Sequence, residues 1–315
     1  MKSSRRSFLA KAGLITGASC LTARWVDAKD LPADRKIKLR FAIASDLHYG
    51  QSNTPYDEFA ENMVGWINKE KKEKGLDLFF INGDITHDKA ELLPQLRDKH
   101  LKNLEVPYYC IKGNHDYVDE KSDSPSGSWK KIWGYDANNT VQHKDFAFVM
   151  ADTTVAAKSN VYLAADKEWL FNEFKKFAKA PAIFSFIHIQ QRKHNKGGWP
   201  AHGVGAVDQV EKAEAVMDLL ENTPNVRAVF HGHNHNESKM WVSGQRRYFF
   251  DSHVGGSWGA PKGYRIVEVD DKHNMLTYQI NAEKKVELNR NKLPPVSYTH
   301  LRAHETRHDL VCRLL

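Results

Sequence analysis

The sequence predicts an α/β protein in which helices cover the outer faces of two packed sheets. Three observations lead to this fold class. Short apolar runs of strand length alternate with segments of helical period, several of these runs end in a polar cluster, and strand-like segments alone follow residue 240. We therefore expect a layered sandwich whose strands are parallel early in the chain and antiparallel late.

The expected elements follow one another along residues 37–280. The run 37–45 reads as a buried strand, and the segment 56–74 has apolar residues at helical spacing before Gly75 ends it, as a C-cap glycine would. The later elements are strand 76–81, helix 89–103, strands 106–111 and 146–151, a helix opening at Asp166, strand 182–187, helix 208–220, strand 226–230, and strand-like segments in 240–250 and 263–280.

The N-terminal residues read as an export signal. The pair Arg5 and Arg6 precedes a mostly apolar or small stretch, 10–23, which is too short to span a bilayer as a helix. A small-residue cleavage candidate ends at Ala28, so we predict a twin-arginine signal peptide over residues 1–28. The twin-arginine (Tat) export machinery is then a partner, the protein is periplasmic or extracellular, and no transmembrane span is expected.

A lipid-anchored form is the lesser alternative. The stretch Gly17 to Cys20 loosely resembles a lipidation box, although Gly17 stands where a bulky aliphatic residue is usual. At the other end, residues 296–315 follow a Pro-Pro pair and resemble adaptor-derived translations at the ends of environmental sequence assemblies. We expect this tail to be non-native or disordered, which leaves residues 29–295 as the catalytic domain.

The net charge and the cysteine content exclude few classes of function for residues 29–295. The formal net charge is +7, of which the leader contributes +4 and the tail +1, so residues 29–295 carry about +2. This balance gives no reason to expect nucleic acid as a partner. Cys20 and Cys312 fall in the two ends, which leaves Cys110 alone and no intramolecular disulfide framework.

Five polar clusters each follow an apolar, strand-like run. In chain order they are Asp46 with His48, G-D at 83–84, G-N-H-D at 113–116, His188, and G-H-N-H at 232–235. A single strand-end Asp or Asn is usually a cap or turn residue, and a lone buried histidine usually satisfies a hydrogen bond. A packed core has no need of five such clusters, whereas a two-metal hydrolase does.

In these blocks the chain resembles the calcineurin-like metallophosphoesterase superfamily over residues 37–281. The resemblance implies a four-layer αββα sandwich with mixed sheets and a dimetal site at the carboxyl ends of the strands. It implies that Asp84 bridges two ions, with Asp46, His48 and His235 completing one site and Asn114, His188 and His233 the other. Oxygen and imidazole ligands without thiolate suit manganese, iron or zinc more than calcium.

The resemblance also implies a mechanism. A hydroxide bridging the ions would attack phosphorus in line, and His115, which is not a ligand in the family, would protonate the leaving oxygen as a general acid. For Asp116 we expect one of two roles, either setting the ring of His115 or contacting the metal shell.

Two branches of the superfamily are less similar to this chain. Protein serine/threonine phosphatases carry G-D-x-x-D-R-G, whose second aspartate pairs with the catalytic histidine. Here His87 stands at that position and the arginine is absent, which leaves the orienting partner of His115 open. Purple acid phosphatases place a metal-binding tyrosine at the position of His87, so that branch is also disfavoured.

The G-N-H-D and G-H-N-H blocks are most similar to bacterial members that include class III cyclic-nucleotide phosphodiesterases and nucleotide or phospho-alcohol pyrophosphatases. A phosphodiester or diphosphate bond in a small phosphorylated substrate is therefore the expected target. The alternative is a phosphomonoesterase that scavenges phosphate. A non-catalytic scaffold is disfavoured because His115 and all the ligands are kept, and a nuclease because a basic stripe is missing.

Four further histidines could contact substrate or support the ligands: His87, His202, His231 and His253. His231 is as readily structural as it is a support for the ligand histidines, His253 lies in a glycine-rich loop, and His202 lies in a loop that otherwise reads as a mobile surface segment. Substrate specificity is expected to depend on the loops 153–163, 192–204 and 253–262.

Overall fold

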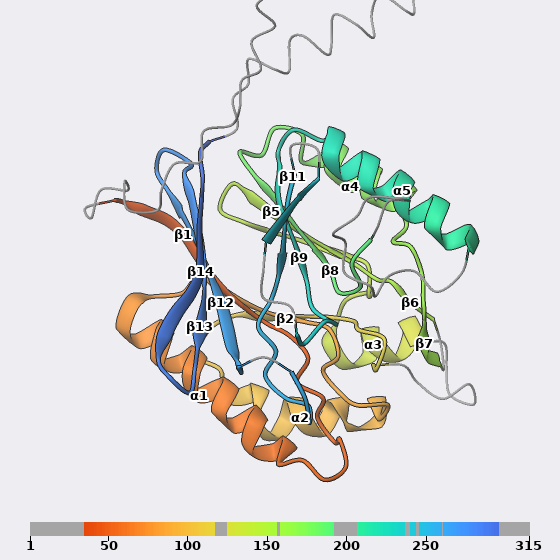
Figure 1. Cartoon of the computed structure of the whole chain (residues 1–315), viewed down its shortest axis with the longest axis vertical. Coiled ribbons are helices and arrows are strands. Elements are labelled where there is room, and N and C mark those ends of the chain that lie inside the picture. Colours follow the sequence, from red (N-terminus) through yellow and green to blue (C-terminus); the bar gives the residue numbers. More distant parts are fainter. Residues whose placement is uncertain are drawn as a thin grey trace, which may run out of the picture.

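The computed structural model describes residues 35–116, 125–155, 158–191, 207–236, 240–243, 246–259 and 261–295. The predicted signal peptide, the tail 296–315 and His202 lie outside these ranges. Two six-stranded sheets pack face to face, with α1, α2 and α3 outside the first sheet and α4 and α5 outside the second (Figure 1). The predicted four-layer αββα sandwich is confirmed.

The first sheet is mixed, with the strand order β14-β13-β12-β1-β2-β3. Its parallel strands are β1 (Ile37–Ala44), β2 (Leu78–Asn82) and β3 (Tyr108–Ile111), and its antiparallel strands are β12 (Gly263–Asp270), β13 (Met275–Asn281) and β14 (Val286–Leu293). The sequence did not predict β14, which is mostly exposed at the edge of the sheet and lacks an apolar run.

The second sheet has the order β10-β11-β9-β8-β5-β4. Its strands are β4 (Asn139–His143), β5 (Phe146–Ala151), β8 (Ile183–Ile187), β9 (Val226–His231), β10 (Met240–Ser243) and β11 (Arg246–Phe250), while β6 (Thr154–Val155) and β7 (Lys158–Tyr162) form a separate ribbon. β11 runs parallel to β9, which corrects the expectation that the strand-like segments after residue 240 are antiparallel.

Helix α1 (Tyr56–Lys74) matches the predicted bounds and ends at Gly75, whose φ of 77° suits glycine. The predicted helix 89–103 is wrong as one element. It consists of a 3-10 turn, the short helix α2 (Leu93–Lys99) and a second 3-10 turn. Pro94 stands in the first turn of α2, where a missing N–H breaks no helical hydrogen bond, so the helix begins there.

Helices α4 (Lys167–Lys176) and α5 (Val207–Asn222) cover the second sheet, and α3 (Pro125–Trp133), which the sequence did not predict, lies on the side of the first. Asp166 caps α4 as expected, because its carboxylate accepts a hydrogen bond of 3.0 Å from the N–H of Trp169. In the described part of the chain, no helix is both long and apolar enough to cross a bilayer.

The core between the sheets is rich in phenylalanine. Along β1 the side chains alternate, so Phe41 points between the sheets and the small Ala42 and Ala44 face α1. The ring of Phe41 lies 5.3 Å from that of Phe148 and 5.1 Å from that of Phe184, both on the second sheet. Burying such a side chain contributes about 1.5–3 kcal/mol, so the interlocked rings fix the two sheets relative to each other.

Candidate metal centre

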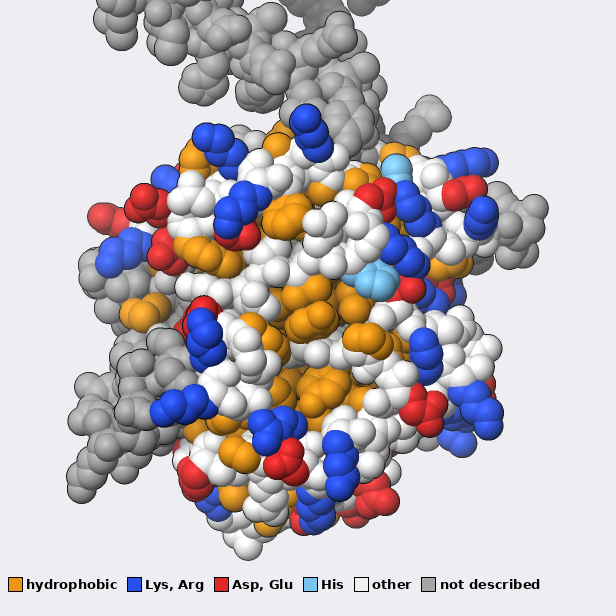
Figure 2. All heavy atoms as spheres, turned by 180° about the vertical axis from the view of Figure 1, so that it is seen from behind, with side chains coloured by type: hydrophobic (Ala, Val, Ile, Leu, Met, Phe, Trp, Pro, Cys, Tyr) orange, Lys and Arg blue, Asp and Glu red, His pale blue; other side chains and the backbone are white. Residues whose placement is uncertain are grey.

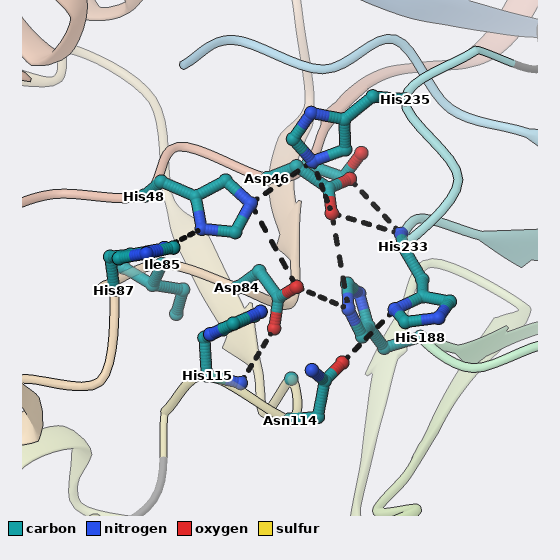
Figure 3. A network of polar contacts seen from close by, with 12 residues as sticks. Asp46, His48, Asp84, Ile85, His87, Asn114, His115, His188, His233 and His235 are labelled. Carbon is teal, nitrogen blue, oxygen red and sulfur yellow. Dashed lines mark hydrogen bonds and ion pairs between the residues drawn. The ribbon is translucent and has the colours of Figure 1, made fainter. Parts of the chain in front are cut away.

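The predicted polar clusters meet where β1, β2, β3, β8 and β9 end (Figure 3). All seven predicted metal ligands lie there: Asp46, His48, Asp84, Asn114, His188, His233 and His235. Six of these side chains could hold an ion as two groups of three, with the donor atoms of each group within 4.8 Å of one another. Because β1 to β3 and β8 to β9 belong to different sheets, only the packing of the sandwich brings the groups together.

The first group contains Asp46, His48 and His235. The Nε2 atoms of His48 and His235 face each other at 3.0 Å, and Nε2 of His235 lies 3.3 Å from Oδ1 of Asp46. All three side chains are buried, and they come from the loops after β1 and β9. Imidazole nitrogens and a carboxylate oxygen that converge in this way form a donor set for a divalent cation.

The second group contains Asp84, His188 and His233, with Asn114 beside them. Oδ2 of Asp84 lies 3.2 Å from Nε2 of His188 and 3.9 Å from Nε2 of His48, so it stands between the two groups. Oδ1 of Asn114 lies 3.1 Å from Nδ1 of His233. Asp84 therefore occupies the position that a bridging carboxylate requires.

Left-handed backbone positions place several of these side chains. The φ angles are positive at Asp46 (53°), His48 (48°), Asp84 (48°) and His233 (66°). Each such non-glycine position costs about 1–3 kcal/mol and persists because the surrounding structure holds it. The loops after β1 and β2 run side by side, since the N–H groups of Asp46 and His48 donate to the carbonyls of Gly83 and Asp84, each at 2.9 Å.

The motif glycines lie where a side chain has no room. A Cβ atom added at Gly83 would stand 2.2 Å from Nδ1 of His188, and one at Gly113 would stand 2.0 Å from the backbone nitrogen of Asp84. A Cβ at Gly232 would meet both His188 and Asp46 at 2.8 Å. These three glycines therefore let the predicted ligands approach one another closely.

Electrostatics keep the two aspartates ionised despite complete burial. Burial raises the pKa of Asp46 and Asp84, but neighbouring histidines, His235 and His188 above all, hold both values below the ordinary one. Burial lowers the pKa of His188, yet the two carboxylates beside it raise that pKa to about 10. Burial also lowers the pKa of His48 to about 3, which leaves a neutral imidazole with a lone pair available.

The donor set fits two cations. Nε2 of His188 is buried and has no hydrogen-bond partner among the described residues, although it lies between the two carboxylates. Its Nδ1 donates to the backbone carbonyl of Asn82 at 2.7 Å, which aims Nε2 into the cluster. A cation would replace the proton that Asp46 and Asp84 otherwise favour on His188.

His115 stands at the edge of this cluster and is partly exposed. Its orienting partner, which the sequence left open, is Asp88, whose Oδ1 lies 2.7 Å from Nδ1 of His115. Asp88 has a φ of 56° and its N–H donates to the carbonyl of His115 at 3.0 Å, so the backbone turns the carboxylate toward the ring. The pairing aspartate thus stands one position later than the phosphatase pattern would place it.

His87 contacts two predicted site residues instead. Its Nδ1 lies 2.8 Å from Nδ1 of His48, and its ring stacks on that of His115 with centroids 4.7 Å apart and planes 13° apart. A hydrogen bond to the far nitrogen of a metal-binding histidine orients the ring and selects its tautomer. His87 is therefore placed to support His48 rather than to pair with His115.

Asp116 does not set the ring of His115. Its Oδ2 accepts hydrogen bonds from the N–H groups of Gly113 (2.9 Å) and Ile85 (3.1 Å), and its Oδ1 accepts from the N–H of Thr86 at 2.7 Å. Burial raises its pKa to about 6. The side chain joins the loops after β2 and β3, which holds Asp84 and His115 at a constant separation.

The remaining predicted residues differ in their placement. His231 stacks on Trp241 at 5.3 Å and donates from Nδ1 to the carbonyl of Ile187, which is the contact of a buried structural histidine. His253 stacks on His235 at 4.8 Å, beneath the metal centre. His202 lies outside the described residues.

Sequence reasoning missed three residues around the centre: Asn82, Asp88 and Trp258. Asn82 orients His188, and its side-chain amide donates to Oδ2 of Asp251 at 2.6 Å. Trp258 stacks on His235 with centroids 4.7 Å apart. Two of them had a signal in the sequence, because Asp88 lies one position beyond the second aspartate of a known pattern and Trp258 lies in the loop 253–262, which was expected to affect specificity.

Comparison with known sequences agrees with this geometry. The calcineurin-like phosphoesterase family model matches residues 39–237. A probable glycerophosphodiester phosphodiesterase, GpdQ of Arcobacter nitrofigilis, is 27% identical over 191 residues, which are 57% of this chain. The match spans 64% of that protein, which is less than two thirds of its length.

Solved structures share the fold at low sequence identity. A dimetal phosphatase from Danio rerio has a TM-score of 0.62 and 12% identity, covering 83% of this chain and 100% of that one. The purple acid phosphatase PPD1 of yellow lupin has a TM-score of 0.55 and 15% identity, covering 84% of this chain and 55% of that one. GAP50 of Plasmodium, an anchor in the inner membrane complex, has a TM-score of 0.53 and 13% identity, covering 83% of this chain and 90% of that one.

Proposed function

The chain belongs to the calcineurin-like phosphoesterase family and is a metal-dependent phosphoric ester hydrolase, and from that premise we propose that it cleaves a phosphodiester or diphosphate bond. The observation that carries the proposal is the joint placement of two ligand groups and one partly exposed histidine. Asp84 of one group also lies 3.9 Å from His48 of the other, and His115 lies beside them with its ring held by Asp88.

The seven predicted ligands would hold two ions, for which manganese, iron and zinc are the candidates. Bound ions would supply Lewis-acid activation and neutralise charge on the phosphoryl oxygens. Asp84 would serve both ions, and its carboxylate also accepts a hydrogen bond of 2.9 Å from the N–H of His115. That bond ties the position of the proton donor to the position of the metal centre.

His115 would act as the general acid. With Nδ1 bonded to Asp88, the ring has Nε2 left to give a proton to the leaving oxygen. His115 is 21% exposed at its side chain, whereas His48 and Asp84 are 1% and 2% exposed. A leaving group can therefore reach the ring from solvent while His48 and Asp84 stay buried.

One comparison favours a diester over a monoester, because the relative at 27% identity is called a phosphodiesterase. A phosphate-scavenging monoesterase is the second candidate.

The face drawn in Figure 2 gives no support for nucleic acid as the substrate. On the face drawn in Figure 2, Lys and Arg side chains alternate with Asp and Glu around a central group of hydrophobic side chains, without a basic stripe. We also propose export by the twin-arginine route, which the pair Arg5 and Arg6 supports. Recovery of the protein in the periplasmic fraction, and its loss from that fraction when both arginines become lysine, would test this.

The bond is tested with the purified, manganese-loaded protein. Hydrolysis of bis-p-nitrophenyl phosphate is compared with that of p-nitrophenyl phosphate, using Asp84→Asn as the blank. We expect a higher kcat/KM for the diester. A higher value for the monoester would replace the proposal with the scavenging phosphatase, and no hydrolysis of either by protein with two bound metals would contradict a general diesterase.

A further inference from the structure

Trp258 differs in exposure from every ring around it. Its side chain is 46% exposed, whereas His48 is 1% exposed and both His235 and His253 are 4% exposed. It lies in the glycine-rich loop between β11 and β12, directly beside the metal centre. Part of this large indole is therefore exposed to solvent and does not pack against other side chains.

Backbone contacts hold this loop against the ligand-bearing loops. The N–H groups of Val254 and Gly255 donate to the carbonyls of Ser45 and Asp46, each at 2.9 Å. The carbonyl of Trp258 accepts a hydrogen bond of 3.3 Å from Nδ1 of His235. A Cβ at Gly255 would stand 1.8 Å from the carbonyl oxygen of Leu47, so the approach requires glycine. The indole is thereby placed at a set distance from the metal centre.

The rings near Trp258 form a row that leads to the general acid. The indole stacks on His235 with centroids 4.7 Å apart and planes 9° apart, and its centroid lies 5.5 Å from that of His48. Its centroid also lies 6.5 Å from that of His87, with the two planes at 68°, and His87 stacks on His115 at 4.7 Å. A group attached to the oxygen that His115 protonates would extend along His87 toward Trp258.

We propose that Trp258 forms a stacking platform for a planar heteroaromatic ring, with His87 on the path from His115, so that the substrate is a nucleoside phosphodiester. The inference rests on the proposed function, because it takes the leaving oxygen to lie beside His115. Flat stacking on an indole face favours a π system, which a nucleobase has and a glycerol group lacks. It needs no hydrogen bonds to base edges, so the platform selects rings without distinguishing among the bases.

The first test compares two diesters, adenosine 3′,5′-cyclic phosphate and glycerophosphoglycerol, which has neither a ring nor a cation to place on an indole, in manganese-loaded protein. The ratio of their kcat/KM values cancels general losses of activity. We expect Trp258→Ala to lower this ratio about tenfold, mainly through KM for the nucleotide. Trp258→Phe should stay within about threefold of the wild-type ratio, because a phenyl ring also stacks.

A matched control is Phe171→Ala in α4, which removes another exposed aromatic ring, 52% exposed, outside the site. It should leave the ratio unchanged. A ratio in Trp258→Ala within twofold of the wild type would overturn the inference while leaving the phosphodiesterase proposal intact.

A binding measurement separates failure of the inference from failure of the proposed function. Adenosine 5′-monophosphate is titrated into the metal-loaded protein while tryptophan fluorescence is followed. Quenching in the wild type that disappears in Trp258→Phe supports the platform even if neither diester is cleaved, a result that would count against the phosphodiesterase proposal alone. An identical titration in the two proteins would overturn the platform.

Discussion

The floor and the rim of the metal centre are built in different ways. The floor consists of the seven predicted ligands, of which all but His233 are buried. The rim consists of His87, Asp88, His115 and Trp258, which are partly or largely exposed. Left-handed backbone positions and motif glycines recur in the floor, whereas in the rim a left-handed backbone at Asp88 combines with side-chain contacts between neighbouring loops.

The rim departs from a known pattern at Asp88. Its own left-handed backbone position (φ 56°) turns the carboxylate toward His115 from one position later, and His87 contacts His48 instead. In the floor, the left-handed positions Asp46, His48, Asp84 and His233 carry predicted ligands.

The largest expected effect concerns Asp84, which stands between the two ligand groups. Asp84→Asn removes the carboxylate charge that is proposed to serve both ions, so kcat should fall by about 10²–10³ and one equivalent of metal should be lost. Steady-state kinetics and elemental analysis on the same sample would measure both. Activity within tenfold of the wild type with full metal content would show that Asp84 does not bridge the two metal sites.

Gly83→Ala tests the backbone placement of the floor. Its Cβ would stand 2.2 Å from Nδ1 of His188 at a φ of 84°, so His188 must move. We expect loss of most activity and a free energy of unfolding lower by about 1–3 kcal/mol, measured by urea denaturation. The control is Gly65→Ala in α1, where a Cβ meets nothing within 4 Å and should stabilise by about 0.4–1 kcal/mol. Equal effects of Gly83→Ala and Gly65→Ala on activity and stability would show that the close contact at Gly83 does not place the floor.

Asp88→Asn tests the rim with a smaller expected effect. Loss of the carboxylate that holds His115 should lower kcat about 10- to 100-fold at unchanged metal content, whereas His115→Ala should cost about 10²–10⁴. The double variant should be no worse than His115→Ala, because both act through one ring. Additive losses would mean that Asp88 acts independently of His115. Asp98→Asn, an exposed aspartate paired with Arg97, should leave kcat unchanged.

The smallest effect concerns Asp251, which lies beneath the floor and contacts Asn82. Burial raises its pKa to about 8, although Arg265 and Asn82 oppose this. The folded protein therefore favours the protonated form, and that contribution to stability is lost as pH rises from about 4 to about 8. In EDTA, Asp251→Asn should have a higher Tm than the wild type, and the difference should grow from pH 5 to pH 8.5. Each kcal/mol of stability corresponds to about 2–4 °C in Tm. If the Tm values of the two proteins changed in parallel with pH, ionisation of Asp251 would not lower the stability of the wild type.

The sequence alone determined those features that depend on neighbouring residues. Apolar periodicity located α1 and most of the strands, and the polar residues directly after β1, β2, β3, β8 and β9 identified the floor. Such features need only the local chain, because a strand end presents its next residues at a sheet edge. Where local patterns were weak, the prediction failed, as for the exposed edge strand β14 and for the helix that begins again at Pro94.

Only the tertiary structure decided which distant loops touch. The pairing of Asp88 with His115, the support of His48 by His87, the link from Asp251 through Asn82 to His188, and the stacking of Trp258 on His235 join residues 23 to 169 positions apart. These contacts follow from the packing of two sheets and from the turn of each loop beyond its strand. No local pattern encodes them, because a side chain's partner depends on how the whole sandwich closes.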